Sequence, residues 1–129
     1  MTAETDPRAP RRAAERRGRR AELAAVWLLR AKGFRILARR YRTPVGEIDL
    51  IARRAGVVAF VEVKSRPTLA EAAEALTPAG RQRIARAASL WLARNPAAAE
   101  LTLRFDAVLL APRCWPRHMA GVFDADGAA

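Results

Sequence analysis

Two runs of apolar residues, 48–52 and 57–63, form the strongest pattern in the sequence. Each run is nearly continuously apolar, which is typical of central strands that are covered on both faces of a sheet. The residues between the runs are polar or small and include Gly56, so they predict a tight turn at Ala55 and Gly56. The pattern therefore predicts an antiparallel hairpin at the centre of the fold.

Each run contains one acidic residue, Asp49 in the first and Glu62 in the second. In a hairpin that is symmetric about its turn, these residues face each other with Cβ atoms roughly 4.5–5.5 Å apart. Two carboxylates at about 5 Å repel by about 3 kcal/mol at an effective dielectric constant of 20, and a divalent cation between them offsets this repulsion. Lys64 leaves the same face as Glu62, which adds a group that activates water or stabilises charge. The alternative is a surface hairpin with an ordinary Glu–Lys pair.

Helical spacing of apolar residues predicts a first helix from about residue 13 to Gly33, which serves as the residue after its C-cap. Glu22 lies at the margin of the buried stripe of this helix. Thr77 followed by Pro78 predicts an N-cap and the first residue of a second helix, which ends at about residue 94.

Further strands are predicted at residues 34–42, 101–110 and 117–123, and residues 68–79 form either a short helix or a loop. The order α-β-β-β-α-β-β predicts an α/β fold with a central mixed sheet of about five strands flanked by helices. Asp106 in the fourth strand is expected to make a salt link with an arginine, and His118 is expected to be structural. Glu47 is either an outer acid of the site or a solvated residue.

The length of 129 residues predicts a single domain, here residues 13–124, with one core. Residues 1–12 carry prolines and charges without apolar periodicity and are expected to form a disordered basic tail, and residues 125–129 a frayed end. The single cysteine, Cys114, excludes an internal disulfide. No apolar run reaches the ~18 residues of a membrane span and no secretory signal is visible, so we expect a cytoplasmic protein without membrane contact.

The formal net charge is +11, and all but two of the basic residues are arginine. Such a charge favours an anionic polymer as partner, with phosphate contacts that weaken as salt rises. The alternative is that the arginine content only reflects genome composition. The arginines expected to contact nucleic acid lie at the end of the first strand, after the hairpin and on the second helix: Arg39, Arg40, Arg42, Arg66, Arg81 and Arg83.

The stretches GEIDLIA (46–52) and FVEVKSR (60–66) resemble the YraN-like family of small uncharacterised bacterial proteins. Further matching stretches are GRRAELAAVWLLRAKGF (18–34), RFDAVLL (104–110) and HMAGVF (118–123). By fold, that family belongs to the restriction-endonuclease-like, PD-(D/E)XK nuclease superfamily, which includes archaeal Holliday junction resolvases. The family usually has a lysine near the start of the second helix, where this chain has Gly80 and Arg81.

The resemblance implies a Mg²⁺- or Mn²⁺-dependent nuclease with one or two ions, acting on DNA in preference to RNA. Asp49, Glu62 and the carbonyl of Val63 would hold the metal, Lys64 would act on the attacking water, and Glu22 would bind metal waters or a second ion. A homodimer stays open by analogy with junction resolvases. The alternatives are a nucleic-acid-binding protein with a vestigial metal site and, as a weaker reading, a protein-interaction scaffold.

Overall fold

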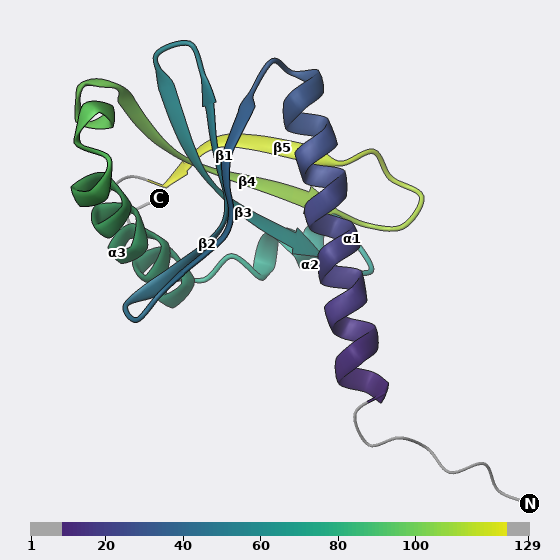
Figure 1. Ribbon diagram of the computed structural model, residues 1–129. Coiled ribbons are helices and arrows are strands. Elements are labelled where there is room, and N and C mark those ends of the chain that lie inside the picture. The colour runs from purple at the N-terminus through teal and green to yellow at the C-terminus, as the bar shows by residue number, and fades with distance from the viewer. Residues whose placement is uncertain (1–8, 124–129) are drawn as a thin grey trace, which may run out of the picture.

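The computed structural model describes residues 9–123 (Figure 1). The elements follow in the order α1 (Ala9–Ala31), β1 (Arg35–Thr43), β2 (Gly46–Arg54), β3 (Val57–Ser65), α2 (Leu69–Glu74), α3 (Pro78–Arg94), a 3₁₀ helix η1 (Pro96–Glu100), β4 (Thr102–Leu110) and β5 (Arg117–Phe123). The segment that was left open between helix and loop contains the short helix α2. Within the described residues, no helix combines the length and the apolarity needed to cross a membrane.

The first helix begins earlier than expected, because α1 already includes residues 9–12. The prediction of a disordered tail is therefore wrong for these four residues, and its remainder lies outside the described part of the chain, as does the predicted frayed end. Pro10 is compatible with helix here because a proline in the first turn removes no intrahelical hydrogen bond. The alanines and arginines that follow are good helix formers.

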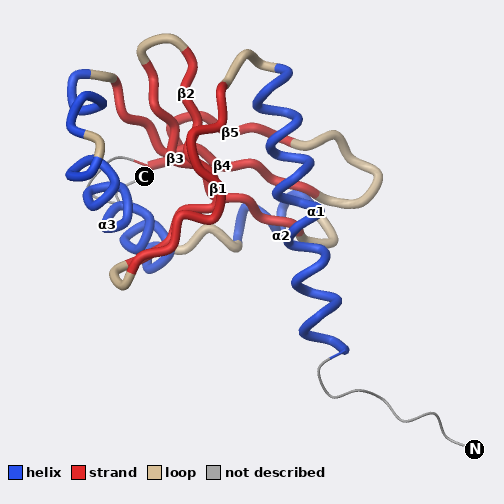
Figure 2. Tube along the Cα trace, viewed as in Figure 1, coloured by secondary structure: helices blue, strands red, loops and turns tan. Residues whose placement is uncertain are grey.

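The five strands form one mixed sheet in the order β1-β2-β3-β4-β5 (Figure 2). All neighbouring pairs are antiparallel except β3 and β4, which are parallel and are connected through α2, α3 and η1. Helix α1 covers one face of the sheet, and α3 covers the other (Figure 1). The predicted fold class, a mixed α/β sheet flanked by helices, is confirmed.

The central hairpin has the predicted register. The pairs run from Arg54 opposite Val57 to Leu50 opposite Val61, and Ala55 with φ of +50° and Gly56 form the turn. The ladder between β2 and β3 ends at the pair Leu50–Val61, one position before Asp49. The two strands therefore diverge just before Asp49 and Glu62, and the expectation that these two residues face each other as a pair of the ladder is wrong.

Both faces of the hairpin are buried, which explains why its two strands are almost wholly apolar. On one face, Leu50 and Val61 pack with Val26 and Leu29 of α1. On the other face, Phe60 packs edge to face against Trp91 of α3, with ring centroids 5.7 Å apart. The buried stripe predicted for the first helix is confirmed.

The predicted end of the first helix and the predicted start of the second are also confirmed. Gly33 follows α1 with φ of +92°, a conformation that costs glycine little, and Phe34 donates its N–H to the carbonyl of Leu29 at 2.9 Å. At the start of α3, the hydroxyl of Thr77 accepts a hydrogen bond from the N–H of Gly80 at 3.1 Å. These caps fix where the chain leaves α1 for β1 and where α3 begins.

The start of β2 passes directly over the backbone of α3. A Cβ atom at Gly46 would overlap the carbonyl oxygen of Arg83, so only glycine permits this approach. Gly46 therefore sets the path of the segment that leads into Glu47 and Asp49.

We predict that Gly46→Ala lowers the free energy of unfolding by about 3 kcal/mol, the upper end of the usual cost of overpacking, because strand and helix backbones must separate. Thermal unfolding followed by circular dichroism measures the loss. Gly56→Ala is the matched control, since a Cβ there meets no atom within 4 Å. Equal melting temperatures for the two variants would contradict the assigned role of Gly46.

Candidate active site

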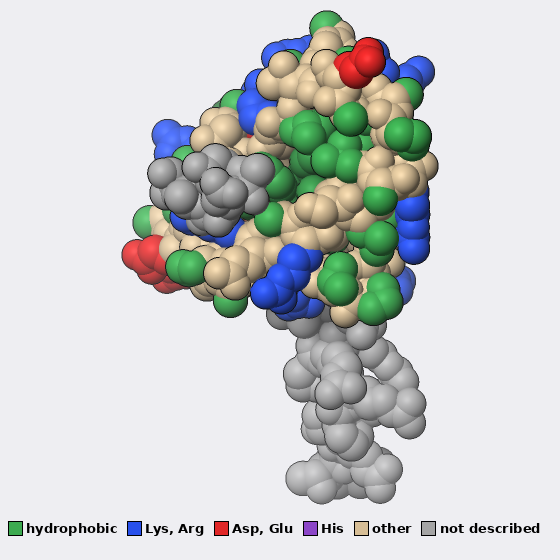
Figure 3. All heavy atoms as spheres, turned by 90° about the vertical axis from the view of Figure 1, so that its left-hand side faces the viewer, with side chains coloured by type: hydrophobic (Ala, Val, Ile, Leu, Met, Phe, Trp, Pro, Cys, Tyr) green, Lys and Arg blue, Asp and Glu red, His purple; other side chains and the backbone are tan. Residues whose placement is uncertain are grey.

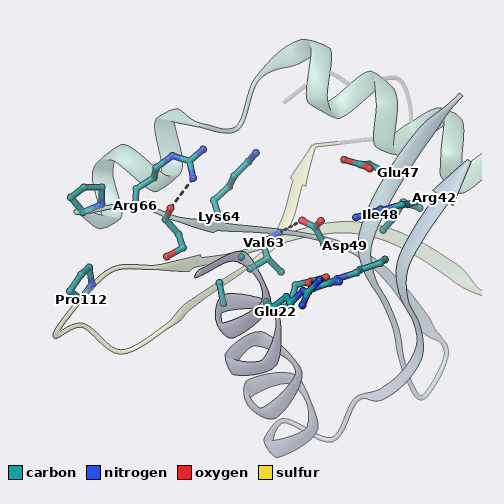
Figure 4. Close-up of a pocket in the computed structure, with 15 residues that line it drawn as sticks. Glu22, Arg42, Glu47, Ile48, Asp49, Val63, Lys64, Arg66 and Pro112 are labelled. Carbon is teal, nitrogen blue, oxygen red and sulfur yellow. Dashed lines mark hydrogen bonds and ion pairs between the residues drawn. The ribbon is translucent and has the colours of Figure 1, made fainter. Parts of the chain in front are cut away.

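Asp49 lies where β2 and β3 diverge. Its Oδ2 accepts a hydrogen bond from the backbone N–H of Val63 at 2.7 Å (Figure 4). Every buried backbone N–H needs an acceptor, and here a carboxylate takes the place that a carbonyl of the neighbouring strand would have in a continued ladder. The side chain therefore joins the two strands while they separate.

A cavity of about 920 Å³ opens at this point. It is lined by the middle of α1, by β1 and β2, by the end of β3 and the residues after it, and by the loop between β4 and β5 (Figure 4). Of the residues predicted from the sequence, it brings together Glu22, Arg40, Arg42, Asp49, Val63, Lys64 and Arg66. Glu47, whose role was left open, also lines it, so five basic and three acidic side chains share one cavity when Arg19 is included.

Glu22 reaches the cavity from α1 and is only 7% exposed. Its Oε2 accepts a hydrogen bond from Nε of Arg40 at 2.6 Å, whereas Oε1 is buried and has no hydrogen-bond partner among the described residues. Arg40 has φ of +51°, in the left-handed region that an arginine rarely adopts. Such strained conformations concentrate at functional sites.

Glu62 is 8% exposed and lies next to the cavity without forming part of its wall. Its Oε1 is 3.1 Å from Nζ of Lys64, and Oε2 is buried without a hydrogen-bond partner among the described residues. A Cβ at Gly80 would lie 3.6 Å from Oε1, so the carboxylate is close to the start of α3. Lys64, which does line the cavity, connects this second acid to it.

The electrostatics of Asp49 reflect its neighbours. The pKa of Asp49 is raised from its ordinary 3.8 to about 6. Burial is the largest cause, the negative charges of Glu62 and Glu22 add to it, and the Val63 N–H and Lys64 oppose it. A carboxyl group whose pKa is raised by burial and by two other acids is typical of a functional site.

The donor set fits a hard divalent cation. Two buried carboxylate oxygens, Oε1 of Glu22 and Oε2 of Glu62, lack partners among the described residues, and an unpaired buried acceptor of this kind is costly. Within residues 9–123, no group of three or more His, Cys, Asp or Glu side chains is arranged to hold a metal ion unaided. An ion here would also need the Val63 carbonyl and water, which suits Mg²⁺, since it keeps several waters and uses one or two carboxylates.

The six predicted arginines are placed differently. Arg40, Arg42 and Arg66 line the cavity, and Arg39 lines a smaller hollow with Arg19 and Arg40. Arg83 is paired with Glu47 at 3.8 Å, and Arg81 stands 5.6 Å from the ring of Phe123, outside the cavity wall. On the face shown in Figure 3, basic side chains are scattered around the margin and form no continuous stripe. Three of the six predicted arginines therefore share the cavity with acidic residues.

The sequence analysis did not single out Pro112 or Arg19 as residues of the site. Pro112 follows β4, and its place depends on the parallel pairing of β3 and β4, for which the local sequence carries no signal. Arg19 lies one helical turn before Glu22, so the extent of α1 could have indicated it.

The salt link expected at Asp106 is confirmed, and His118 is in contact with the same carboxylate. Asp106 is fully buried and accepts hydrogen bonds from Arg104 at 2.8 and 2.9 Å and from the N–H of Gly121 at 3.1 Å, and its Oδ2 lies 2.8 Å from Nε2 of His118. Burial opposes ionisation, but these hydrogen bonds outweigh it and lower the pKa of Asp106. Nζ of Lys32 is 2.8 Å from Nδ1 of His118, so the cluster ties β4, β5 and the end of α1 together.

The comparisons with known proteins agree on one family. The model of the uncharacterised protein family UPF0102 matches residues 21–110, a span that includes Glu22, Asp49, Glu62 and Lys64. A UPF0102 protein of Rhodopseudomonas palustris (strain BisA53) is 58% identical over 120 residues, which cover 92% of each chain. One of Bradyrhizobium sp. (strain ORS 278) is 61% identical over 113 residues, covering 88% of this chain and 80% of its own. One of Methylorubrum extorquens (strain PA1) is 53% identical over 127 residues, covering 98% and 99%.

We predict that Asp49→Asn stabilises the metal-free protein at pH 8. Because the pKa of Asp49 is higher in the folded state, its contribution to stability is fully present below about pH 4 and is lost as the pH rises through about 6. The interval from 3.8 to about 6 corresponds to at most about 3 kcal/mol. Asparagine cannot ionise but still offers an oxygen to the Val63 N–H.

Thermal unfolding in EDTA from pH 4 to pH 8 measures this gain, which should vanish at the acidic end. Glu47→Gln, at an exposed acid of the same cavity, is the control and should show no gain. An Asp49→Asn variant that is less stable than the parent at pH 8 would show that the carboxylate is not destabilised by its surroundings.

Proposed function

This chain belongs to the uncharacterised protein family UPF0102, the YraN-like family that its sequence resembles, and we propose that it is a metal-dependent nuclease that hydrolyses phosphodiester bonds in DNA. One observation carries the proposal. Glu22, which has a buried oxygen without a partner among the described residues, and Asp49, whose pKa is raised, both line a cavity that also contains arginines. The acids suit a cation and the arginines suit a polyanion, which together are the requirements of such a nuclease.

Asp49, Glu62 and the carbonyl of Val63 are the groups that would hold Mg²⁺ or Mn²⁺, and Glu22 would bind metal-coordinated water or a second ion. A bound ion supplies Lewis-acid polarisation of the phosphate and a water of lowered pKa. The raised pKa of Asp49 makes proton and cation competitors for the same carboxylate, so occupancy of the site should increase with pH through about 6.

Lys64 and the arginines would act directly on the substrate. Nζ of Lys64 lies 3.1 Å from Glu62 and lines the cavity, so it is placed to orient the attacking water and to stabilise the charge that grows on the phosphate. Arg42 and Arg66 are exposed on the same cavity and would hold phosphate oxygens on either side of the scissile bond. The resemblance to restriction-endonuclease-like proteins favours DNA as the substrate. The likeness to junction resolvases within that superfamily favours branched or otherwise structured DNA.

We expect Mg²⁺- or Mn²⁺-dependent cleavage in a screen of branched, flapped, single-stranded and duplex DNA. Lys64→Ala and Glu62→Ala should lower the cleavage rate at least about 100-fold while DNA binding persists, because each removes a group needed only for the reaction. Glu100→Gln, at an exposed acid on η1, is the control and should cleave like the parent.

A parent protein that cleaves none of these substrates with either metal would contradict the proposal. Cleavage by Lys64→Ala at the parent rate would contradict it equally, since it would place the activity elsewhere or in a contaminant.

A second function, a nucleic-acid-binding protein with a vestigial metal site, is favoured by the Lys64–Glu62 ion pair, which neutralises one of the acids without metal. Calorimetric titration with Mg²⁺ and Mn²⁺ separates the two functions. The nuclease requires heat of binding that disappears in Asp49→Asn, whereas DNA binding without any metal heat supports the non-catalytic protein. Absence of DNA binding at all salt concentrations would favour the weaker third reading, a protein-interaction scaffold.

A further inference from the structure

Trp115 is 92% exposed, more than any other large apolar side chain among the described residues. It lies in the loop between β4 and β5. An indole that stays in water contributes almost no hydrophobic stabilisation to the fold. Trp115 therefore does little for stability, and its large flat surface is free for a ligand.

The loop that carries Trp115 leaves the sheet beside the cavity. Because β3 and β4 are parallel and Ser65 is paired with Leu110, both strands end at the same edge. The N–H of Arg66 also donates to the carbonyl of Leu110 at 3.0 Å, and Pro112 lines the cavity together with Arg66. Figure 4 shows Pro112 and Arg66 at the same end of the cavity, and Figure 1 shows the loop projecting from this edge of the sheet.

The turn before Trp115 is well defined. The N–H of Cys114 donates to the carbonyl of Ala111 at 3.3 Å, and Arg113 has φ of +62°. After this tight turn the indole points into solvent and does not pack on the sheet. The loop is also basic, since exposed Arg113 and Arg117 flank Trp115 and residues 111–118 contain no acid.

Proteins bind unpaired nucleic acid with exposed aromatic rings beside basic grooves, and Trp115 lies between arginines in a loop whose Pro112 lines a cavity with five basic side chains. We propose that Trp115 stacks on an unpaired base of the strand whose phosphates enter the cavity, so that the substrate carries a single-stranded segment at the Arg66 end. This assignment rests on the proposed nuclease function and names its substrate class. In a fully paired duplex the bases are already stacked on one another and offer Trp115 no free face.

Binding of labelled oligothymidylate and of a duplex of equal length, in EDTA and at one fixed salt concentration, tests the assignment. Trp115→Ala should weaken binding of the unpaired strand by about 5- to 100-fold, as loss of one stacked base predicts, and change duplex binding less than about twofold. Trp115→Phe should retain most of the affinity, because it keeps a ring.

Trp27→Ala is the matched control. Trp27 is also exposed, at 66%, but lies on α1 with the guanidinium of Arg30 5.6 Å from its ring and is not among the residues lining the cavity. The Trp27→Ala variant should bind the unpaired strand and the duplex with the affinity of the parent.

Three results would overturn the assignment. In the first, Trp115→Ala would bind the unpaired strand as tightly as the parent, and in the second it would lose affinity for strand and duplex equally. In the third, sedimentation would show a dimeric parent and a monomeric Trp115→Ala, which would place the indole against a second copy of the chain. If the parent protein binds neither DNA, the proposed nuclease function is contradicted. If only the Trp115→Ala variant binds like the parent, the stacking of Trp115 alone is contradicted.

Discussion

The hydrogen bond from the Val63 N–H to the Asp49 carboxylate is the interaction on which the site depends. It lies where the ladder between β2 and β3 has ended, and it lets the strands separate without leaving a buried donor unpaired. Two constraints keep β2 on its separate path: the close approach of Gly46 to Arg83 and the left-handed backbone of Arg40 in β1. A continued ladder would close the space that the cavity occupies.

The contrast between Asp49 and Asp106 shows how the fold shifts the pKa values of two aspartates in opposite directions. Asp106 is fully buried, but donors from Arg104, His118 and Gly121 surround it and its pKa is lowered. Asp49 receives a single backbone hydrogen bond and faces other acids, and its pKa is raised. A bound cation would supply positive charge beside Asp49 and favour the ionised form of its carboxyl group.

The sequence sufficed wherever local rules decide the structure. The turn at Gly56, the caps at Gly33 and Thr77 and the register of the hairpin follow from short-range patterns, and all are confirmed. The ladder ends before Asp49 and Glu62, however, so these two acids do not form the pair that a symmetric hairpin predicts. The sequence left open whether Glu62 pairs with Lys64, because that contact depends on how α3 packs against β3.

The pairing of strands that are distant in sequence could not be predicted from local patterns either. The parallel contact of β3 with β4 forms only after the α2–α3 crossover, and it brings the loop of Pro112 and Trp115 to the cavity. The positive φ of Arg40 was equally hidden, since nothing in its neighbours requires a left-handed residue within a strand. The arginine-rich composition indicated an anionic partner, but only the fold selects which arginines stand beside the acids.

The most direct test of the account is anomalous diffraction from crystals of this protein grown with Mn²⁺. The account predicts a peak within coordination distance of the Asp49 carboxylate and the Val63 carbonyl, with Lys64 drawn away from Glu62 as that carboxylate turns to the ion. Full occupancy of Mn²⁺ at some other site, or no peak while Nζ of Lys64 stays on Glu62, would contradict it.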